Sequence, residues 1–158
     1  MPRFGTVPPE PKPITSLDGL APKFRAAVER VLAANDQRVI SESLRTIERQ
    51  AWLYGFGREW DDGRGIVTHA SGTTGWHPYG LAVDIIHRRK GWDAPMDFWE
   101  ALGADAEREG LVWGGRWKMR DLPHVQFGAP MRTTPSAQAA HLAADGGLVA
   151  LWRAVGAD

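Results

Sequence analysis

The stretch HPYGLAVDII, residues 77–86, places a histidine in a turn and an aspartate inside an apolar run. The proline and glycine near its start favour a tight turn, and the apolar residues that follow predict a buried strand. Alternation along this strand puts Asp84 on the opposite face from Val83 and Ile85. An unpaired buried carboxylate is energetically expensive. We therefore expect Asp84 to face a cleft rather than the core, with the turn folding His77 over the same cleft.

Two interpretations of this pair remain open from the stretch alone. In the first, His77 and Asp84 belong to one functional site. In the second, Asp84 caps the amide of a neighbouring loop, and His77 is an unrelated surface histidine.

The segment DLPHVQF, residues 121–127, presents a similar pairing of a histidine with a carboxylate. His124 and Gln126 share one face of an extended segment, and Asp121 lies three positions before His124. A single histidine on a strand is usually a core or surface residue. However, the chain has no cysteine, so any metal must be held by nitrogen and oxygen ligands. His77, Asp84 and His124 would form a three-ligand set that leaves zinc one open position, with Asp121 as the candidate base.

The bulk composition is that of an ordinary globular protein. The 158 residues fit one domain, and the formal net charge of zero gives no electrostatic indication of nucleic-acid or anionic-membrane binding. No apolar run approaches the ~20 residues that span a bilayer. The N-terminus lacks the apolar segment of a signal peptide, so we expect synthesis in the cytoplasm. We also expect a monomer.

Local patterns predict the order of the elements. Residues 1–16 form a proline-rich arm that we expect to be mobile, residues 17–128 form the domain, and residues 129–158 form an alanine-rich helical tail packed on the domain. Helices are predicted over 17–34, 44–60, 94–109 and 135–155. Strands are predicted in 37–43, 81–86, 111–117 and 121–127. The second helix is expected to bury an apolar stripe of Leu44, Ile47, Ala51 and Tyr54.

Four blocks carry a family resemblance in the right order: SLRTIERQ at 43–50, VTHASGTTGWHPYGLAVDI at 67–85, GLVWGGRW at 110–117 and DLPHVQF at 121–127. Together they resemble the VanY-type zinc peptidases, which comprise D-Ala-D-Ala carboxypeptidases and L-alanyl-D-glutamate endopeptidases and include phage endolysins. The resemblance covers roughly residues 17–128. It implies a single α+β domain with a small antiparallel sheet flanked by helices, which is the fold shared with the hedgehog signalling domain.

The resemblance also implies roles for individual residues. One zinc ion per chain would be held by His77, Asp84 and His124. Asp121 matches the general base, and Arg45 matches the arginine that stabilises the oxyanion; a structural salt bridge at a helix end is the alternative for Arg45. The tentative substrate or supporting positions are Gln50, Gln126, Thr74 and Trp76. The family serine two residues before the first histidine is Gly75 here, with Thr73 and Thr74 close by.

The expected substrate is the stem peptide of bacterial peptidoglycan. The resemblance favours an L-alanyl-D-glutamate endopeptidase of the phage endolysin type, which would act on the cell wall after release. A D-Ala-D-Ala carboxypeptidase is the alternative within the family. A non-catalytic hedgehog-like binding module is the alternative of another class, and the presence of Asp121 argues against it.

Overall fold

A four-stranded antiparallel sheet forms the centre of the computed structural model, which describes residues 3–71, 75–128, 131–132 and 134–158. The strand order is β1-β2-β4-β3. These strands are β1 (Arg38–Glu42), β2 (Ala82–His87), β3 (Val112–Trp113) and β4 (His124–Gln126). The predicted α+β class and antiparallel sheet are confirmed. β3 and β4 are shorter than the predicted strands because glycine and proline residues interrupt pairing around them.

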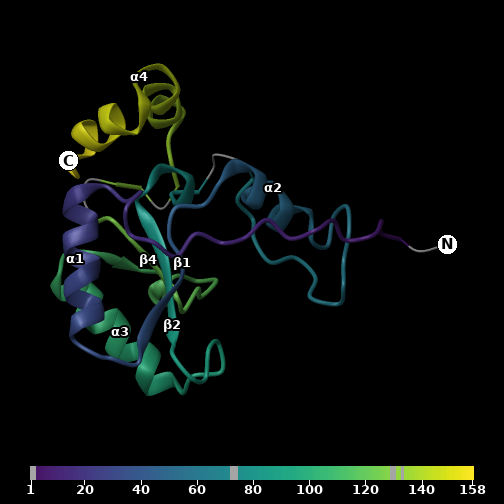
Figure 1. Cartoon of the computed structure of the whole chain (residues 1–158), viewed down its shortest axis with the longest axis horizontal. Coiled ribbons are helices and arrows are strands. Elements are labelled where there is room, and N and C mark those ends of the chain that lie inside the picture. The colour runs from purple at the N-terminus through teal and green to yellow at the C-terminus, as the bar shows by residue number, and fades with distance from the viewer. Residues whose placement is uncertain (1–2, 72–74, 129–130, 133) are drawn as a thin grey trace.

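Helices α1 (Pro22–Ala33) and α3 (Met96–Arg108) cover one face of this sheet (Figure 1). α1 begins five residues later than the predicted start at residue 17, because Pro22 occupies its first turn, where a missing N–H costs nothing. Phe24 of α1 and Leu102 of α3 are fully buried against Val83, Ile85 and Val125 of the sheet. The apolar face of the strands is therefore used for the core, which leaves the other face for polar residues.

Helix α2 (Ile47–Gly55) lies on the other side of the sheet together with the N-terminal segment (Figure 1). The indole of Trp52 donates a hydrogen bond to the carbonyl of Pro8, and the amide of Ser43 donates one to the carbonyl of Ile14. The predicted apolar stripe on this helix is wrong. Ile47 is 59% exposed, whereas Arg49 and Gln50 are buried. The helix buries this polar side because carboxylates that pair with it lie there, as described below.

Helix α4 (Ala137–Val155) follows the sheet domain and is kinked at Gly147, whose φ is 76°. Its second half contacts the domain: Leu151 is fully buried, and the indole of Trp152 donates a hydrogen bond to the carbonyl of Tyr79. Two short 3-10 turns complete the chain, η1 (His77–Tyr79) and η2 (Gly114–Arg116). Within the described residues, none of the helices has the length and apolar character required to cross a membrane.

Candidate functional site

Three ionisable side chains stand in a row across the sheet. Asp84 of β2 is paired in register with Glu42 of β1 on one side and with His124 of β4 on the other. The pairing between β1 and β2 shifts between Ile40 and Glu42, which is the signature of a bulge. The bulge places Glu42 opposite Asp84. The polar face of the sheet thus gathers one histidine and two carboxylates.

His77 reaches the same row from the turn η1. Pro78 lies at the start of this turn, and Gly80 ends it with a φ of 69°, a left-handed conformation that favours glycine. A Cβ on Gly80 would also lie 2.5 Å from the carbonyl oxygen of Gly19. The backbone carbonyl of His77 accepts a hydrogen bond from the amide of Arg45, which fixes the turn beside the N-terminal end of α2.

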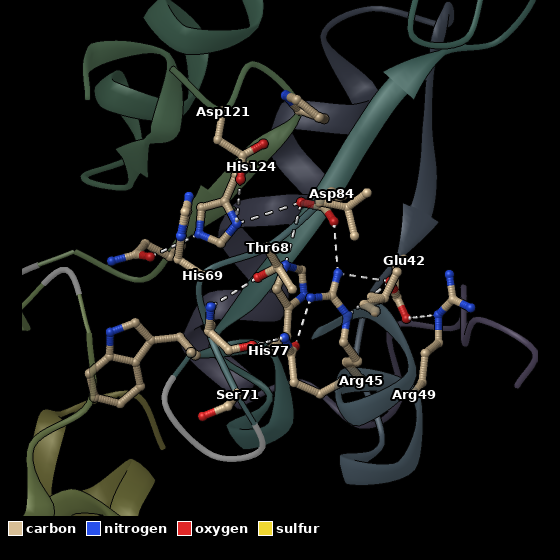
Figure 2. Close-up of a pocket in the computed structure, with 18 of the residues that line it drawn as sticks. Glu42, Arg45, Arg49, Thr68, His69, Ser71, His77, Asp84, Asp121 and His124 are labelled. Atoms are coloured by element: carbon tan, nitrogen blue, oxygen red, sulfur yellow. Dashed lines mark hydrogen bonds and ion pairs between the residues drawn. The ribbon is translucent and has the colours of Figure 1, made fainter. Parts of the chain in front are cut away.

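The three predicted metal ligands come together (Figure 2). Nε2 of His77 lies 3.4 Å and Nδ1 of His124 lies 3.6 Å from the same oxygen of Asp84, Oδ1. One ligand atom from each residue lies within 4.8 Å of the other two. His77 is therefore buried against Asp84 rather than an unrelated surface histidine, as the first of the two interpretations requires.

The outer nitrogens of both histidines have hydrogen-bond partners. Nδ1 of His77 lies 3.2 Å from the carbonyl oxygen of Ser43, and Nε2 of His124 lies 2.8 Å from Oε1 of Gln126. Both partners are acceptors, so in the neutral rings these nitrogens carry the protons. The inner nitrogens then keep their lone pairs for a metal, which is the usual arrangement of metal-ligating histidines. Two such imidazoles and one carboxylate fit a divalent transition metal such as zinc.

Asp121 lies beside this cluster on the loop that follows η2. Its Oδ2 is 3.9 Å from Nδ1 of His124, and its side chain is 49% exposed. The loop is held by Gly114, whose carbonyl accepts hydrogen bonds from the amides of Trp117 and Asp121. A Cβ on Gly114 would lie 2.5 Å from the carbonyl oxygen of Asp121. The double glycine of this segment therefore allows the close approach that brings Asp121 to the site.

The pKa values of Asp84 and Asp121 are shifted in opposite directions. Burial alone would raise the pKa of Asp84, but the charge and hydrogen bonding of the two histidines and of Arg45 hold it well below its usual range. Partial burial and the negative charge of Asp84 raise the pKa of Asp121. One carboxylate is thus held ionised as a ligand, and the other is a stronger base than a free aspartate.

Arg45 contacts the other oxygen of Asp84. Its Nη2 lies 3.2 Å from Oδ2 of Asp84 and 2.8 Å from Oε1 of Glu42, and its Nη1 donates to Oε1 of Gln50 at 2.9 Å. Glu42 also accepts a 2.5 Å hydrogen bond from Nε of Arg49. Arg45 and Arg49 therefore share the buried carboxylate of Glu42. Arg45 forms this salt bridge and also lies close to Asp84, the predicted metal ligand.

The cluster opens into a cavity of about 1070 Å³, which is large enough for a peptide. Gln50, Gln126 and Trp76 line it, and so does Trp117, whose ring centre lies 5.0 Å from that of His124. Trp76 is buried and donates its indole N–H to the carbonyl of Arg132. Thr73 and Thr74 lie outside the described residues.

Two buried charged residues that line the cavity, Glu42 and Arg49, were missed from the sequence. Glu42 sits in the predicted strand 37–43, where its role depends on the bulge, and Arg49 lies on a helix face that an apolar pattern predicts to be exposed. The signal that could have found them is the unusual charge density of the segment from Glu42 to Arg49, which holds four charged residues in eight.

Comparisons with known proteins identify a matching family, a similar sequence and a similar solved structure. A family model described as D-alanyl-D-alanine carboxypeptidase matches residues 68–127, the part that contains His77, Asp84, Asp121 and His124. The peptidoglycan L-alanyl-D-glutamate endopeptidase CwlK of Bacillus subtilis is 33% identical over 133 residues, which cover 77% of this chain and 75% of the relative. The crystal structure of the L-Ala D-Glu endopeptidase ChiX of Serratia marcescens is 25% identical, covers 70% of this chain and 82% of its own, and has a TM-score of 0.49.

Proposed function

The chain belongs to the VanY-like family of metallopeptidases, and from this premise we propose that it is a zinc-dependent L-alanyl-D-glutamate endopeptidase that cuts peptidoglycan stem peptides. One observation carries the chemistry: a half-exposed carboxylate, that of Asp121, lies 3.9 Å from a ligand nitrogen of His124 at the edge of an open cavity. The similarity to the L-alanyl-D-glutamate endopeptidase CwlK supports the choice of bond.

His77, Asp84 and His124 would hold the metal. Zinc bound there would lower the pKa of a water molecule and polarise the scissile carbonyl. Asp121 takes the proton of the attacking water and passes it to the leaving amine. The raised pKa of Asp121 suits this task because a stronger base accepts the proton more readily. Because Asp121 is half-exposed, it can meet both the water and the departing nitrogen.

Arg45 is the proposed partner of the developing oxyanion. Its guanidinium is permanently charged and lines the cavity beside Asp84. Its ion pair with Glu42 fixes the direction of the guanidinium before substrate arrives. Such preorganised charge is the kind of stabilisation that lowers the barrier of acyl transfer.

A D-Ala-D-Ala carboxypeptidase is the second candidate, favoured by the description of the family model that matches residues 68–127. A non-catalytic binding module would need no base, so the position of Asp121 beside His124 argues against it. We further propose a phage-type endolysin role, which rests on the resemblance of the four sequence blocks.

The deciding experiment is digestion of purified peptidoglycan by the zinc-loaded protein, followed by mass spectrometry of the new ends. New D-glutamate amino termini are expected. Free D-alanine without them would identify a carboxypeptidase, and the absence of any new end would contradict a peptidase function. The matched control is Asp121→Asn, which should release neither product.

A further inference from the structure

Four arginines line the cavity, and three of them are paired with carboxylates. Arg45 is paired with Glu42 and Asp84, Arg49 with Glu42 and Glu10, and Arg64 with Asp62. The fourth is Arg120. Among the described residues, Arg120 forms no ion pair with a carboxylate, and it is exposed at the rim. Of these four arginines, Arg120 is therefore the one that has no carboxylate partner among the described residues and can bind an anionic group away from the oxyanion assigned to Arg45.

Neutral groups hold the side chain of Arg120 in place. Its Nε donates a 2.9 Å hydrogen bond to the carbonyl oxygen of Gly115, and its Nη2 lies 3.9 Å from the sulfur of Met96. The guanidinium carbon lies 5.9 Å from the ring centre of Trp113. These contacts fix one edge of the guanidinium without neutralising its charge. A fixed and uncompensated guanidinium suits the recognition of a carboxylate.

The position of Arg120 in the chain indicates which end of the substrate it meets. It directly precedes Asp121 on the loop held by Gly114 and Gly115. Asp121 is the residue that returns a proton to the leaving amine in the proposed function. In an L-alanyl-D-glutamate bond, the leaving amine belongs to the glutamate residue. A glutamate joined onward through one of its two carboxyl groups keeps the other one free and ionised.

That free carboxylate would lie close to Asp121, which lines the same cavity, and like charges at close range oppose binding. Arg120 directly precedes Asp121 and lines this cavity, so its positive charge can offset the repulsion. We propose that Arg120 binds the free carboxylate of the D-glutamate residue on the leaving-group side of the bond, and so helps to select the substrate. This inference rests on the proposed endopeptidase function.

The test compares two synthetic stem peptides that differ in one group. One carries the free carboxylate of D-glutamate, and the other carries a carboxamide there. With the zinc-loaded full chain, kcat/KM should be about tenfold higher for the carboxylate peptide, in line with a charge-assisted hydrogen bond at an exposed site. Arg120→Gln should abolish this preference by slowing only the carboxylate peptide, and Arg120→Lys should retain part of it. Arg116→Gln is the matched control, because Arg116 lies outside the cavity lining and is paired with Glu107 at 2.9 Å.

Two results would overturn the inference while leaving the proposed function intact. The wild type could cleave both peptides equally well, or Arg120→Gln could slow both peptides by the same factor. If the wild type cleaved neither peptide, the proposed function would fail instead. Calorimetric binding of the two peptides to the Asp121→Asn variant then tests Arg120 by itself: tighter binding of the carboxylate peptide, lost when Arg120→Gln is added, supports the inference, and equal binding refutes it.

Discussion

Nη2 of Arg45 lies 3.2 Å from Oδ2 of Asp84, the carboxylate oxygen that does not face the histidines. The other oxygen, Oδ1, is the one approached by both His77 and His124. The two oxygens of Asp84 therefore have separate partners, and the guanidinium fixes the direction in which Oδ1 points. Supporting contacts of this kind orient metal ligands and tune their affinity.

Glu42 should be essential for this arrangement. It is 4% exposed and is the shared counter-ion of Arg45 and Arg49. Glu42→Gln removes the negative charge that the nearly buried Arg45 and Arg49 share. Removing one partner of a buried ion pair costs roughly 3–5 kcal/mol. Because glutamine still accepts a hydrogen bond, we expect a loss of about 3 kcal/mol in the free energy of unfolding, measured by urea denaturation.

Glu48→Gln is the matched control for Glu42→Gln. Glu48 lies in the first turn of α2, is exposed and forms no ion pair among the described residues, so its replacement should change stability by less than ~0.5 kcal/mol. Equal effects of the two substitutions would show that the buried network does not contribute to stability.

Metal binding should require the three-residue cluster. Purified protein is expected to hold about one zinc ion per chain, measured by elemental mass spectrometry, because three ligands converge within 4.8 Å. His77→Ala or Asp84→Asn should reduce this content greatly. His141→Ala is the control, since His141 lines a different cavity beside α4. Full hydrolysis of cell walls by chelator-treated protein would rule out a metal-dependent mechanism.

Asp121 should be needed for turnover but not for metal binding. Asp121→Asn preserves the shape of the side chain and removes the base, so we expect kcat to fall by about 10²–10⁴-fold while zinc content and thermal unfolding stay unchanged. Asp93→Asn, an exposed aspartate outside the cavity lining, should leave kcat as it is. A near-normal rate for Asp121→Asn would show that another group accepts the proton.

The central strands and the convergence of His77, Asp84 and His124 were predictable because each depends on a short local pattern. The turn before β2 needs Pro78 and Gly80, and the short apolar run after it forms the buried strand β2, as the pattern predicts. Asp84 and His124 lie on the strand faces opposite Val83 and Val125, which predicts that they face a cleft rather than the core. Their direct register across β2 and β4 is then a consequence of antiparallel pairing.

The buried charges of β1 and α2 were not predictable in the same way. Periodicity counts apolar residues, so it assigned Ile47 to the inside and Arg49 to the outside of α2, the reverse of what is observed. The burial of Arg49 depends on a counter-charge from Glu42, and the position of Glu42 depends on a bulge in another element. No local pattern contains these tertiary partners.

Gly75 offers a test of the departure from the family serine. A Cβ at this position would lie 3.4 Å from the Cβ of Ala70, which is ordinary contact, so a larger residue should fit. Gly75 lines the cavity, which places a serine hydroxyl within reach of substrate. We expect Gly75→Ser to fold as the wild type does and to raise kcat/KM by about threefold to tenfold, the worth of one hydrogen bond.

Gly75→Ala separates the effect of the hydroxyl from that of the added carbon. It brings the same Cβ without a hydrogen-bonding group, so it should match the wild type in both thermal unfolding and kcat/KM. If alanine and serine raised the rate equally, the gain would come from a stiffer backbone before His77, since glycine is the most flexible residue. If neither substitution changed kcat/KM, a hydroxyl group at position 75 would contribute nothing to turnover in this chain.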